Sequence, residues 1–88
     1  SNIESVILKK PIIASPNPFQ ETSSIILSSE LQHGTLIIFD LFGREVQRMQ
    51  NLTGNTITVH RNNLSSGMYY FRLNDGLTVI GSGTISVN

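Results

Sequence analysis

Residues 64–76 read LSSGMYYFRLNDG, a short alternating run that lies between two glycine-containing turns. In an extended strand, side chains alternate between the two faces of a sheet, so Tyr69, Phe71 and Leu73 share one face and the residues between them share the other. These three apolar side chains predict a strand over residues 68–74 that turns this face toward the protein core.

The loop that precedes this strand predicts a tyrosine corner. In β-sandwiches of the immunoglobulin kind, a tyrosine near the start of the sixth strand folds its hydroxyl group back onto the upstream loop backbone. Tyr69 occupies this place in the sequence. We expect Leu64 to anchor the loop in the core and Gly67 to turn the chain into the strand.

Similar short runs recur along the whole chain. They are rich in β-branched and aromatic residues, are separated by Gly, Asn, Asp, Ser and Pro, and nowhere sustain a helical period. The expected strands span residues 3–9, 23–28, 35–40, 44–50, 55–60, 68–74 and 77–87, the last interrupted near Gly81 and Gly83. This spacing predicts an all-β fold, an immunoglobulin-like β-sandwich of about seven antiparallel strands.

Two of these runs differ in their expected burial. Residues 36–39 are apolar at every position, which fits a central strand whose outer face is also partly covered. Ile57 and Val59 instead alternate with polar residues, which fits a half-buried strand with His60 facing water.

Two turns carry a chemical signature. Residues 40–43, Asp-Leu-Phe-Gly, predict a hairpin in which the Asp40 carboxylate caps backbone amides, Gly43 takes a positive φ, and Arg44 pairs with Asp40. Residues 74–76, Asn-Asp-Gly, predict a second hairpin with a loop of type I′.

Residues 14–19 read ASPNPF, a segment with two prolines in close succession. Pro16 and Pro18 each fix φ, remove a backbone donor and push the preceding residue toward extended geometry. We predict a stiff extended crossing, with Asn17 between the prolines, that cannot be a central strand. Phe19 is expected to be the core anchor that fixes where this crossing lands.

The composition allows one domain and excludes several classes of function. The chain has 88 residues, of which 39% are hydrophobic and 14% charged, and its six basic residues balance its six acidic ones. It is too apolar for a disordered tail, has no apolar run that could cross a bilayer, and lacks the positive field that nucleic acid requires. We expect residues 1–10 to hold the end of a linker and the first strand, and residues 3–88 to form a single domain. Ser1-Asn2 could be the remnant of a cleaved tag.

No pattern in the sequence points to catalysis or to a cofactor. Cysteine is absent, and a zinc site built on His33 and His60 would need carboxylates from distant segments. The chain has no G-x-S-x-G elbow, no G-x-G-x-x-G pattern and no Walker pattern. We therefore expect no enzyme activity, no metal and no cofactor.

Three runs, read in order, resemble a known family. They are residues 16–19 (Pro-Asn-Pro-Phe), residues 40–46 (Asp-Leu-Phe-Gly-Arg-Glu-Val) and residues 64–73 (Leu-Ser-Ser-Gly-Met-Tyr-Tyr-Phe-Arg-Leu). In this order they resemble the type A C-terminal sorting domain of cargo secreted by the bacterial type IX secretion system, or Por secretion system, of Bacteroidetes. The resemblance covers nearly the whole chain from residue 11 onward.

The resemblance implies a signal rather than a catalyst. Domains of this family end secreted enzymes and adhesins, adopt immunoglobulin-like sandwiches, and direct their cargo to an outer-membrane translocon and its shuttle proteins. After export, a cell-surface protease of the sortase type commonly removes the domain by cutting upstream of it, and joins the cargo to an anionic lipopolysaccharide. The implied destination is the cell surface, reached across the periplasm and the outer membrane.

The same resemblance selects candidate recognition residues. They are Pro16, Asn17, Pro18, Phe19, Asp40, Gly43, Arg44, Leu64, Gly67, Tyr69, Ile85 and Val87. Family members often carry a basic residue in the last strand, and residues 83–88 have none. We expect the free edge of this strand to offer backbone groups to a receptor by strand addition, with Ile85 and Val87 supplying specificity, unless these two side chains simply fill the core.

Two other functions fit the composition. An immunoglobulin-like module that binds carbohydrate or protein would need a row of exposed aromatic side chains, for which Tyr70 and Phe42 are the candidates. A passive spacer without a partner is also compatible with the composition, although three ordered runs disfavour it.

Overall fold

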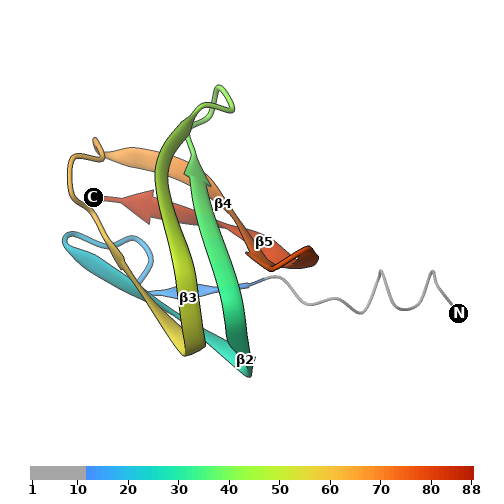
Figure 1. The fold of residues 1–88 in the computed structure, drawn as a ribbon. Coiled ribbons are helices and arrows are strands. Elements are labelled where there is room, and N and C mark those ends of the chain that lie inside the picture. The colour runs from blue at the N-terminus through green and yellow to red at the C-terminus, as the bar shows by residue number, and fades with distance from the viewer. Residues whose placement is uncertain (1–11) are drawn as a thin grey trace, which may run out of the picture.

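The computed structural model of the protein describes residues 12–88, and this part of the chain forms five strands (Figure 1). The strands are β1 (Ala14–Ser15), β2 (Thr22–Phe39), β3 (Glu45–His60), β4 (Gly67–Asp75) and β5 (Thr78–Val87). All pairings between these strands are antiparallel, so the all-β prediction is confirmed. The strand expected over residues 3–9 lies outside the described residues.

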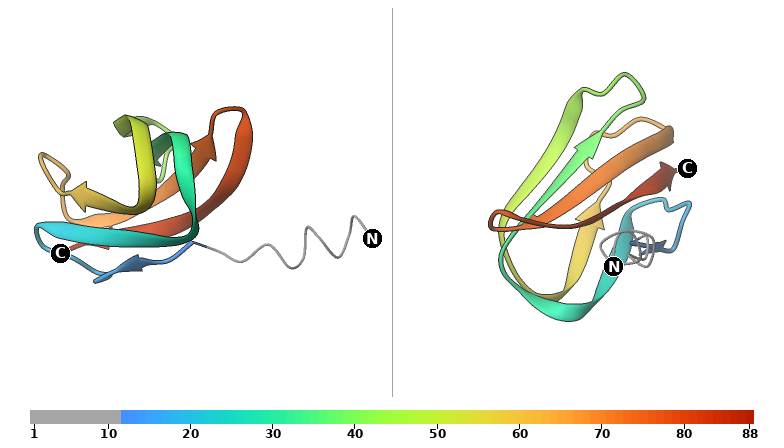
Figure 2. Two further views of the ribbon diagram at one scale, coloured as in Figure 1. Left: turned by 60° about the horizontal axis from the view of Figure 1, so that its bottom comes forward. Right: turned by 90° about the vertical axis from the view of Figure 1, so that its right-hand side faces the viewer.

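β2 organises the sheet. β3 pairs along one edge of β2, while the other edge pairs with β1 near its start and with β4 near its end. β5 then pairs with the far edge of β4. β2 and β3 bend together, so the sheet curls into a half-barrel in which β5 comes round to lie beside β1 (Figure 2).

The prediction of about seven separate strands is not confirmed, because residues 12–88 contain five. The runs predicted at 23–28 and 35–40 are two halves of β2, and those at 44–50 and 55–60 are two halves of β3. The polar stretches between them form register shifts within one continuous pair of strands, with positive φ at Asn51 and Gly54. A bulge bends a strand and keeps most of its ladder, so these stretches bend the chain without ending the strands.

The core lies on the concave side of the curled sheet. Tyr69, Phe71 and Leu73 are 6%, 2% and 0% exposed, so the predicted inward face of this strand is confirmed. Their neighbours on the other face, Met68 and Tyr70, are each 48% exposed. The other members of the core cluster are Ala14, Phe19, Ile25, Leu31, Leu36, Ile38, Ile57, Val59, Leu64, Ile85 and Val87.

The remaining burial predictions also hold. Leu36, Ile37 and Ile38 are buried and Phe39 is half-buried, where β2 pairs with β3 on one edge and with β4 on the other, as expected for a central strand whose outer face is also partly covered. On β3, Ile57 and Val59 are buried while His60 is exposed.

The bend of β2 is fastened by the turn between β4 and β5. The Asp75 carboxylate accepts hydrogen bonds from the backbone amides of Gln32 (3.1 Å) and His33 (2.7 Å), and the Gly76 amide donates to the His33 carbonyl oxygen (2.9 Å). This satisfies backbone donors that the bend removes from the ladder. The predicted hairpin is confirmed, but type I′ is wrong: of the two loop residues only Gly76 has a positive φ, which fits type II′.

Asp75→Ala should lower the free energy of unfolding by about 1–2 kcal/mol, because two amides of the bend lose a charged acceptor. Glu30→Ala removes an exposed carboxylate from the same bend and should change stability by less than about 0.5 kcal/mol. Urea unfolding of both variants measures the difference. Equal stability of Asp75→Ala and the parent chain would show that the carboxylate does not hold the bend.

Candidate functional site

The hairpin between β2 and β3 is held by one carboxylate. Asp40 Oδ1 accepts hydrogen bonds from the amides of Phe42 and Arg44, each at 2.9 Å, and Asp40 Oδ2 accepts one from Arg44 Nε at 2.8 Å. Gly43 has a φ of 84°, and its amide donates to the Asp40 carbonyl oxygen at 3.1 Å. The predicted capping, positive φ and ion pair are all confirmed.

These bonds favour the charged form of Asp40. The Arg44 amide is the largest cause of a pKa below the ordinary value, with further lowering from the Arg44 guanidinium and the Phe42 amide, and partial desolvation opposes them. The carboxylate therefore remains ionised in the folded protein to a lower pH than in the unfolded chain.

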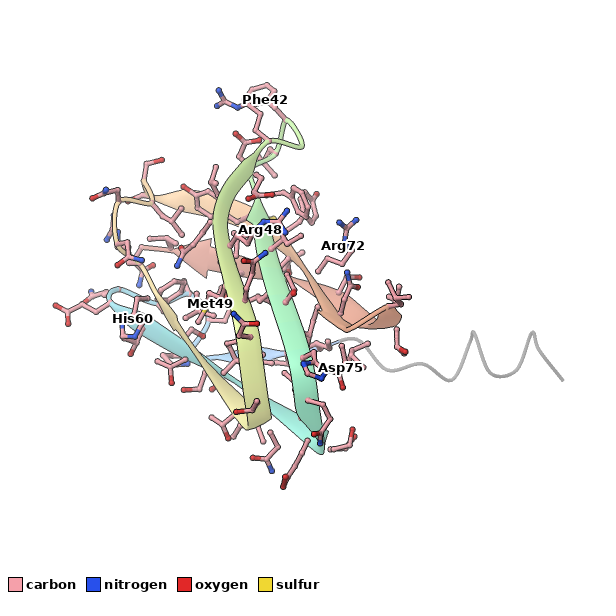
Figure 3. The ribbon with its side chains drawn as sticks, in the orientation of Figure 1. Phe42, Arg48, Met49, His60, Arg72 and Asp75 are labelled. Carbon is pink, nitrogen blue, oxygen red and sulfur yellow. The ribbon has the colours of Figure 1, made fainter. Side chains whose placement is uncertain are left out.

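The tip that this carboxylate holds presents apolar side chains to solvent. Leu41 is 60% exposed and Phe42 is 87% exposed, and Phe42 lies at the outer end of the hairpin (Figure 3). The Arg44 guanidinium lies 5.9 Å from the centroid of the Phe42 ring. The turn thus holds two neighbouring large apolar side chains in solvent.

The loop between β3 and β4 is equally well fixed. The Tyr69 hydroxyl donates to the Ser65 carbonyl oxygen at 2.6 Å, so the predicted tyrosine corner is confirmed. Leu64 is buried as predicted. Its amide donates to the Arg61 carbonyl oxygen, and its carbonyl oxygen accepts from Arg61 Nε, each at 3.0 Å. Gly67 starts β4 with a φ of 143°, a conformation that favours glycine.

The hairpin tip and this loop together line an open groove of about 600 Å³. Val46 of β3 and Met68 of β4 line the groove and are 41% and 48% exposed. Gln47 also lines it; its Nε2 donates to the His60 carbonyl oxygen at 3.3 Å, and its Oε1 is buried and accepts no hydrogen bond from any group within residues 12–88. Within this part of the chain, the groove therefore combines apolar walls with an unpaired acceptor.

The third run, residues 16–19, lies away from this groove, against β5. The Phe19 amide donates to the Ser86 carbonyl oxygen and the Asn88 amide donates to the Phe19 carbonyl oxygen, each at 2.9 Å. Phe19 is 1% exposed, so the predicted core anchor is confirmed. The peptide bonds that precede Pro16 and Pro18 are both cis.

The expected free edge of the final strand is therefore wrong, because residues 12–19 run along it. Ile85 and Val87 are 0% and 4% exposed, which agrees with the alternative in which these two side chains fill the core. The strand pattern alone could show that their side chains alternate with polar ones. It could not show that a segment almost seventy positions earlier covers the outer backbone edge.

Of the predicted recognition residues, the structure brings Asp40, Arg44, Leu64, Gly67 and Tyr69 to the groove, and Gly43 holds the turn beside it. Pro16, Asn17, Pro18, Phe19, Ile85 and Val87 belong instead to the packing around the end of β5. Sequence reasoning missed the groove-lining residues Val46, Gln47, Asn62, Asn63 and Met68, since only the closeness of the two loops in space reveals them.

The described residues show neither a metal-binding cluster nor a membrane-spanning helix. Among residues 12–88, no three His, Asp or Glu side chains gather closely enough to hold a metal ion. In the same residues, no helix is long and apolar enough to cross a membrane. What the groove supplies is a shaped surface of apolar side chains and hydrogen-bonding groups.

Comparison with known proteins identifies the family of the chain. The family model of the secretion system C-terminal sorting domain matches residues 15–86, which include all three runs. The chain therefore belongs to this family, the C-terminal sorting domains of the type IX secretion system. No curated protein matches the chain. Membership makes the domain a sorting signal for secretion across the outer membrane to the cell surface.

Tyr69→Phe should lower the free energy of unfolding by about 1–2 kcal/mol, because it removes the hydroxyl that donates to Ser65 and leaves a part-buried acceptor unpaired. The neighbouring Tyr70→Phe is the matched control: Tyr70 lies on the outer face, and loss of its hydroxyl should cost less than about 0.5 kcal/mol. Chemical denaturation compares the two. Equal losses would contradict a stabilising corner.

Asp40→Asn should reduce the sensitivity of the domain to acid. Because the pKa of Asp40 is lower in the folded state, its stabilising contribution is present above the unfolded pKa and is lost as the pH falls through the folded pKa. The variant should be less stable than the parent at neutral pH, and this gap should narrow toward about pH 2. Urea titrations at both pH values test this. A gap that stays constant with pH would refute the assignment.

Proposed function

We propose that the groove and the exposed hairpin tip beside it form the surface by which the secretion apparatus recognises this domain. Two of the three family runs meet there, and each is fastened by its own hydrogen bonds, to the Asp40 carboxylate and to the Tyr69 hydroxyl. Side chains on such rigid turns lose little conformational freedom on binding, so an exposed residue such as Phe42 is well suited to anchor a partner.

The single observation that carries this proposal is the exposure of Phe42. At 87% exposure the ring contributes little to folding, yet the Asp40 bonds keep its turn in one conformation. On this account the partner is an outer-membrane component of the type IX system, translocon or shuttle protein, with an apolar pocket for the ring. The domain itself acts as signal and substrate and carries out no reaction.

Two further features belong to this proposal. Processing at the cell surface would cut upstream of Ile12, because from that residue on the chain is hydrogen-bonded into the fold. The half-barrel would be a variant of the immunoglobulin-like sandwich in which strand pairs are fused, since the first half of β2 pairs with β1 and its second half with β4.

A secretion assay tests the recognition surface. The domain is fused to a periplasmic reporter and expressed in a host that has the type IX system. In this fusion, Phe42→Ser should reduce the secreted fraction of the reporter by roughly tenfold or more without changing the melting temperature of the domain. The matched control is Leu77→Ser, because Leu77 is 104% exposed but lies in the turn between β4 and β5. Normal secretion of Phe42→Ser, or equal defects in both variants, would contradict the proposal.

One surface favours the alternative, an accessory module that binds carbohydrate or protein. Phe39 and Tyr70 are paired neighbours on the outer face of the sheet, and the Arg72 guanidinium lies 5.4 Å from the centroid of the Phe39 ring. Aromatic faces of this kind can stack on sugar rings. Micromolar binding on a glycan array that Tyr70→Ala abolishes would support this role.

A further inference from the structure

The turn between β4 and β5 contains an Asp-Gly pair, Asp75-Gly76, whose own atoms can react with each other. In an open chain, the backbone nitrogen of such a glycine attacks the side-chain carboxyl carbon of the aspartate and closes a succinimide ring. Glycine favours this step, because it has no side chain to shield its nitrogen and its backbone moves freely. Asp75 is half-buried and Gly76 is exposed, so the pair lies at the surface.

The reaction at such a pair needs no reagent except water. In the first step, a bond forms between Gly76 N and Asp75 Cγ, and the hydroxyl group of the carboxylic acid leaves with the amide hydrogen as water. In the second step, water opens the ring at one of its two carbonyl carbons. Opening at Cγ restores aspartate, whereas opening at the main-chain carbonyl carbon yields isoaspartate, in which the chain runs through Cβ and Cγ. Nothing is oxidised or reduced in either step.

The folded turn keeps both reacting groups occupied. The Asp75 carboxylate accepts hydrogen bonds from the backbone amides of Gln32 (3.1 Å) and His33 (2.7 Å), which direct it toward the bend of β2. The Gly76 amide donates to the His33 carbonyl oxygen at 2.9 Å. Ring closure has to break these hydrogen bonds, because it consumes the amide hydrogen of Gly76 and moves the carboxyl carbon onto Gly76 N. The hydrogen bonds that fasten the bend therefore also hold the two reacting groups apart.

The backbone around the pair is fixed as well. Asp75 pairs with Gly34 of β2 and with Thr78 of β5, so it lies in the sheet between two neighbours. Gly76 has a φ of 59°, which fits the first loop position of a type II′ turn, where glycine is preferred. The turn thus needs glycine at the position where glycine leaves the attacking nitrogen unshielded. Closure of the turn offsets this chemical weakness.

We propose that Asp75-Gly76 is a modification site that the closed bend keeps inert and that unfolding exposes to succinimide and isoaspartate formation. Isoaspartate adds Cβ to the main chain and carries its carboxylate directly on Cα. The altered residue loses the register of β4 with β5, and its shortened carboxylate no longer reaches the amides of Gln32 and His33. Conversion thus removes chains from the reversible folding equilibrium, and it limits how long an unfolded chain can still recover. The modification does not depend on the groove at the hairpin tip.

Peptide mapping by mass spectrometry tests the protection. The whole chain is incubated at one pH and temperature, either folded or unfolded in guanidinium chloride, and isoaspartate at position 75 is quantified over time. Isomerisation leaves the mass of the peptide unchanged, which separates it from deamidation of the neighbouring Asn74. The folded chain should convert roughly 30-fold more slowly than the unfolded chain, or slower still, because the bend has to open first. Equal rates in the two states would overturn the proposal.

The chain offers two controls for this measurement. Asp40 is the other aspartate of the sequence, and it is followed by Leu41, whose side chain shields the backbone nitrogen. In the unfolded chain, Asp40 should therefore convert far more slowly than Asp75. The variant Asp75→Glu would have to close a larger ring, and its position 75 should remain unmodified in both states. Equal conversion of Asp40 and Asp75 in the unfolded chain would show that the Asp-Gly pair is not a special site.

Refolding tests the consequence of the modification. Chains converted at position 75 are separated from unconverted chains by reversed-phase chromatography, and both are refolded and compared by urea unfolding. The converted chains should unfold at a lower urea concentration than the Asp75→Ala variant, because they lose the register of the turn in addition to the carboxylate. Unconverted chains taken through the same steps are the matched control. Equal unfolding midpoints for converted and unconverted chains would refute the proposed effect on the bend.

Discussion

The bend of β2 determines where every other element can lie. One edge of this strand keeps β3 as its partner throughout, while the other edge passes from β1 to β4. If β2 were straight, β1 and β4 would follow one another along its edge, and β5 could not come round to lie beside residues 12–19. The bend brings β1, β4 and β5 round to enclose the core, but it interrupts the ladder of backbone hydrogen bonds between β2 and β3. The Asp75 carboxylate then accepts hydrogen bonds from two amides that the interruption frees, and the Gly76 amide of the type II′ turn donates to the His33 carbonyl oxygen.

Side-chain hydrogen bonds to the backbone also fix the end of the molecule that carries two of the three family runs. Asp40 uses both carboxylate oxygens on the backbone and side chain of its own turn, and Tyr69 uses its hydroxyl on its own loop. These local bonds fix both turns, and the loop is also anchored in the core by Leu64 and the Tyr69 ring. A partner can bind a surface of this kind without any rearrangement of the sheet behind it.

Local features of the structure could be predicted from the sequence, and distant ones could not. Asp40, Gly43 and Tyr69 act within four residues of their own positions, so residue type and spacing are sufficient to predict their bonds. The alternation of Tyr69, Phe71 and Leu73 likewise predicts their burial. The hydrogen bond from the Ser86 amide to Asn17 Oδ1 joins positions 69 residues apart, and no local pattern encodes it.

The strand count failed for a related reason. Polar stretches in β2 and β3 have the composition of turns, and only their pairing with each other shows that they are bulges. The groove was missed because it belongs to neither loop alone. Gln47 and Met68 look unremarkable in sequence and become neighbours of one cavity only after the sheet has curled.

The central claim, that the hairpin tip is the surface which the secretion apparatus contacts, is tested most directly by site-specific photocrosslinking during export. A photoreactive phenylalanine analogue at position 42 should form one adduct with an outer-membrane component of the type IX system. The same analogue at position 77 should form none, and the adduct should vanish in a host that lacks the system. Absence of any adduct from position 42 during productive secretion, or the same adduct from position 77, would contradict the account.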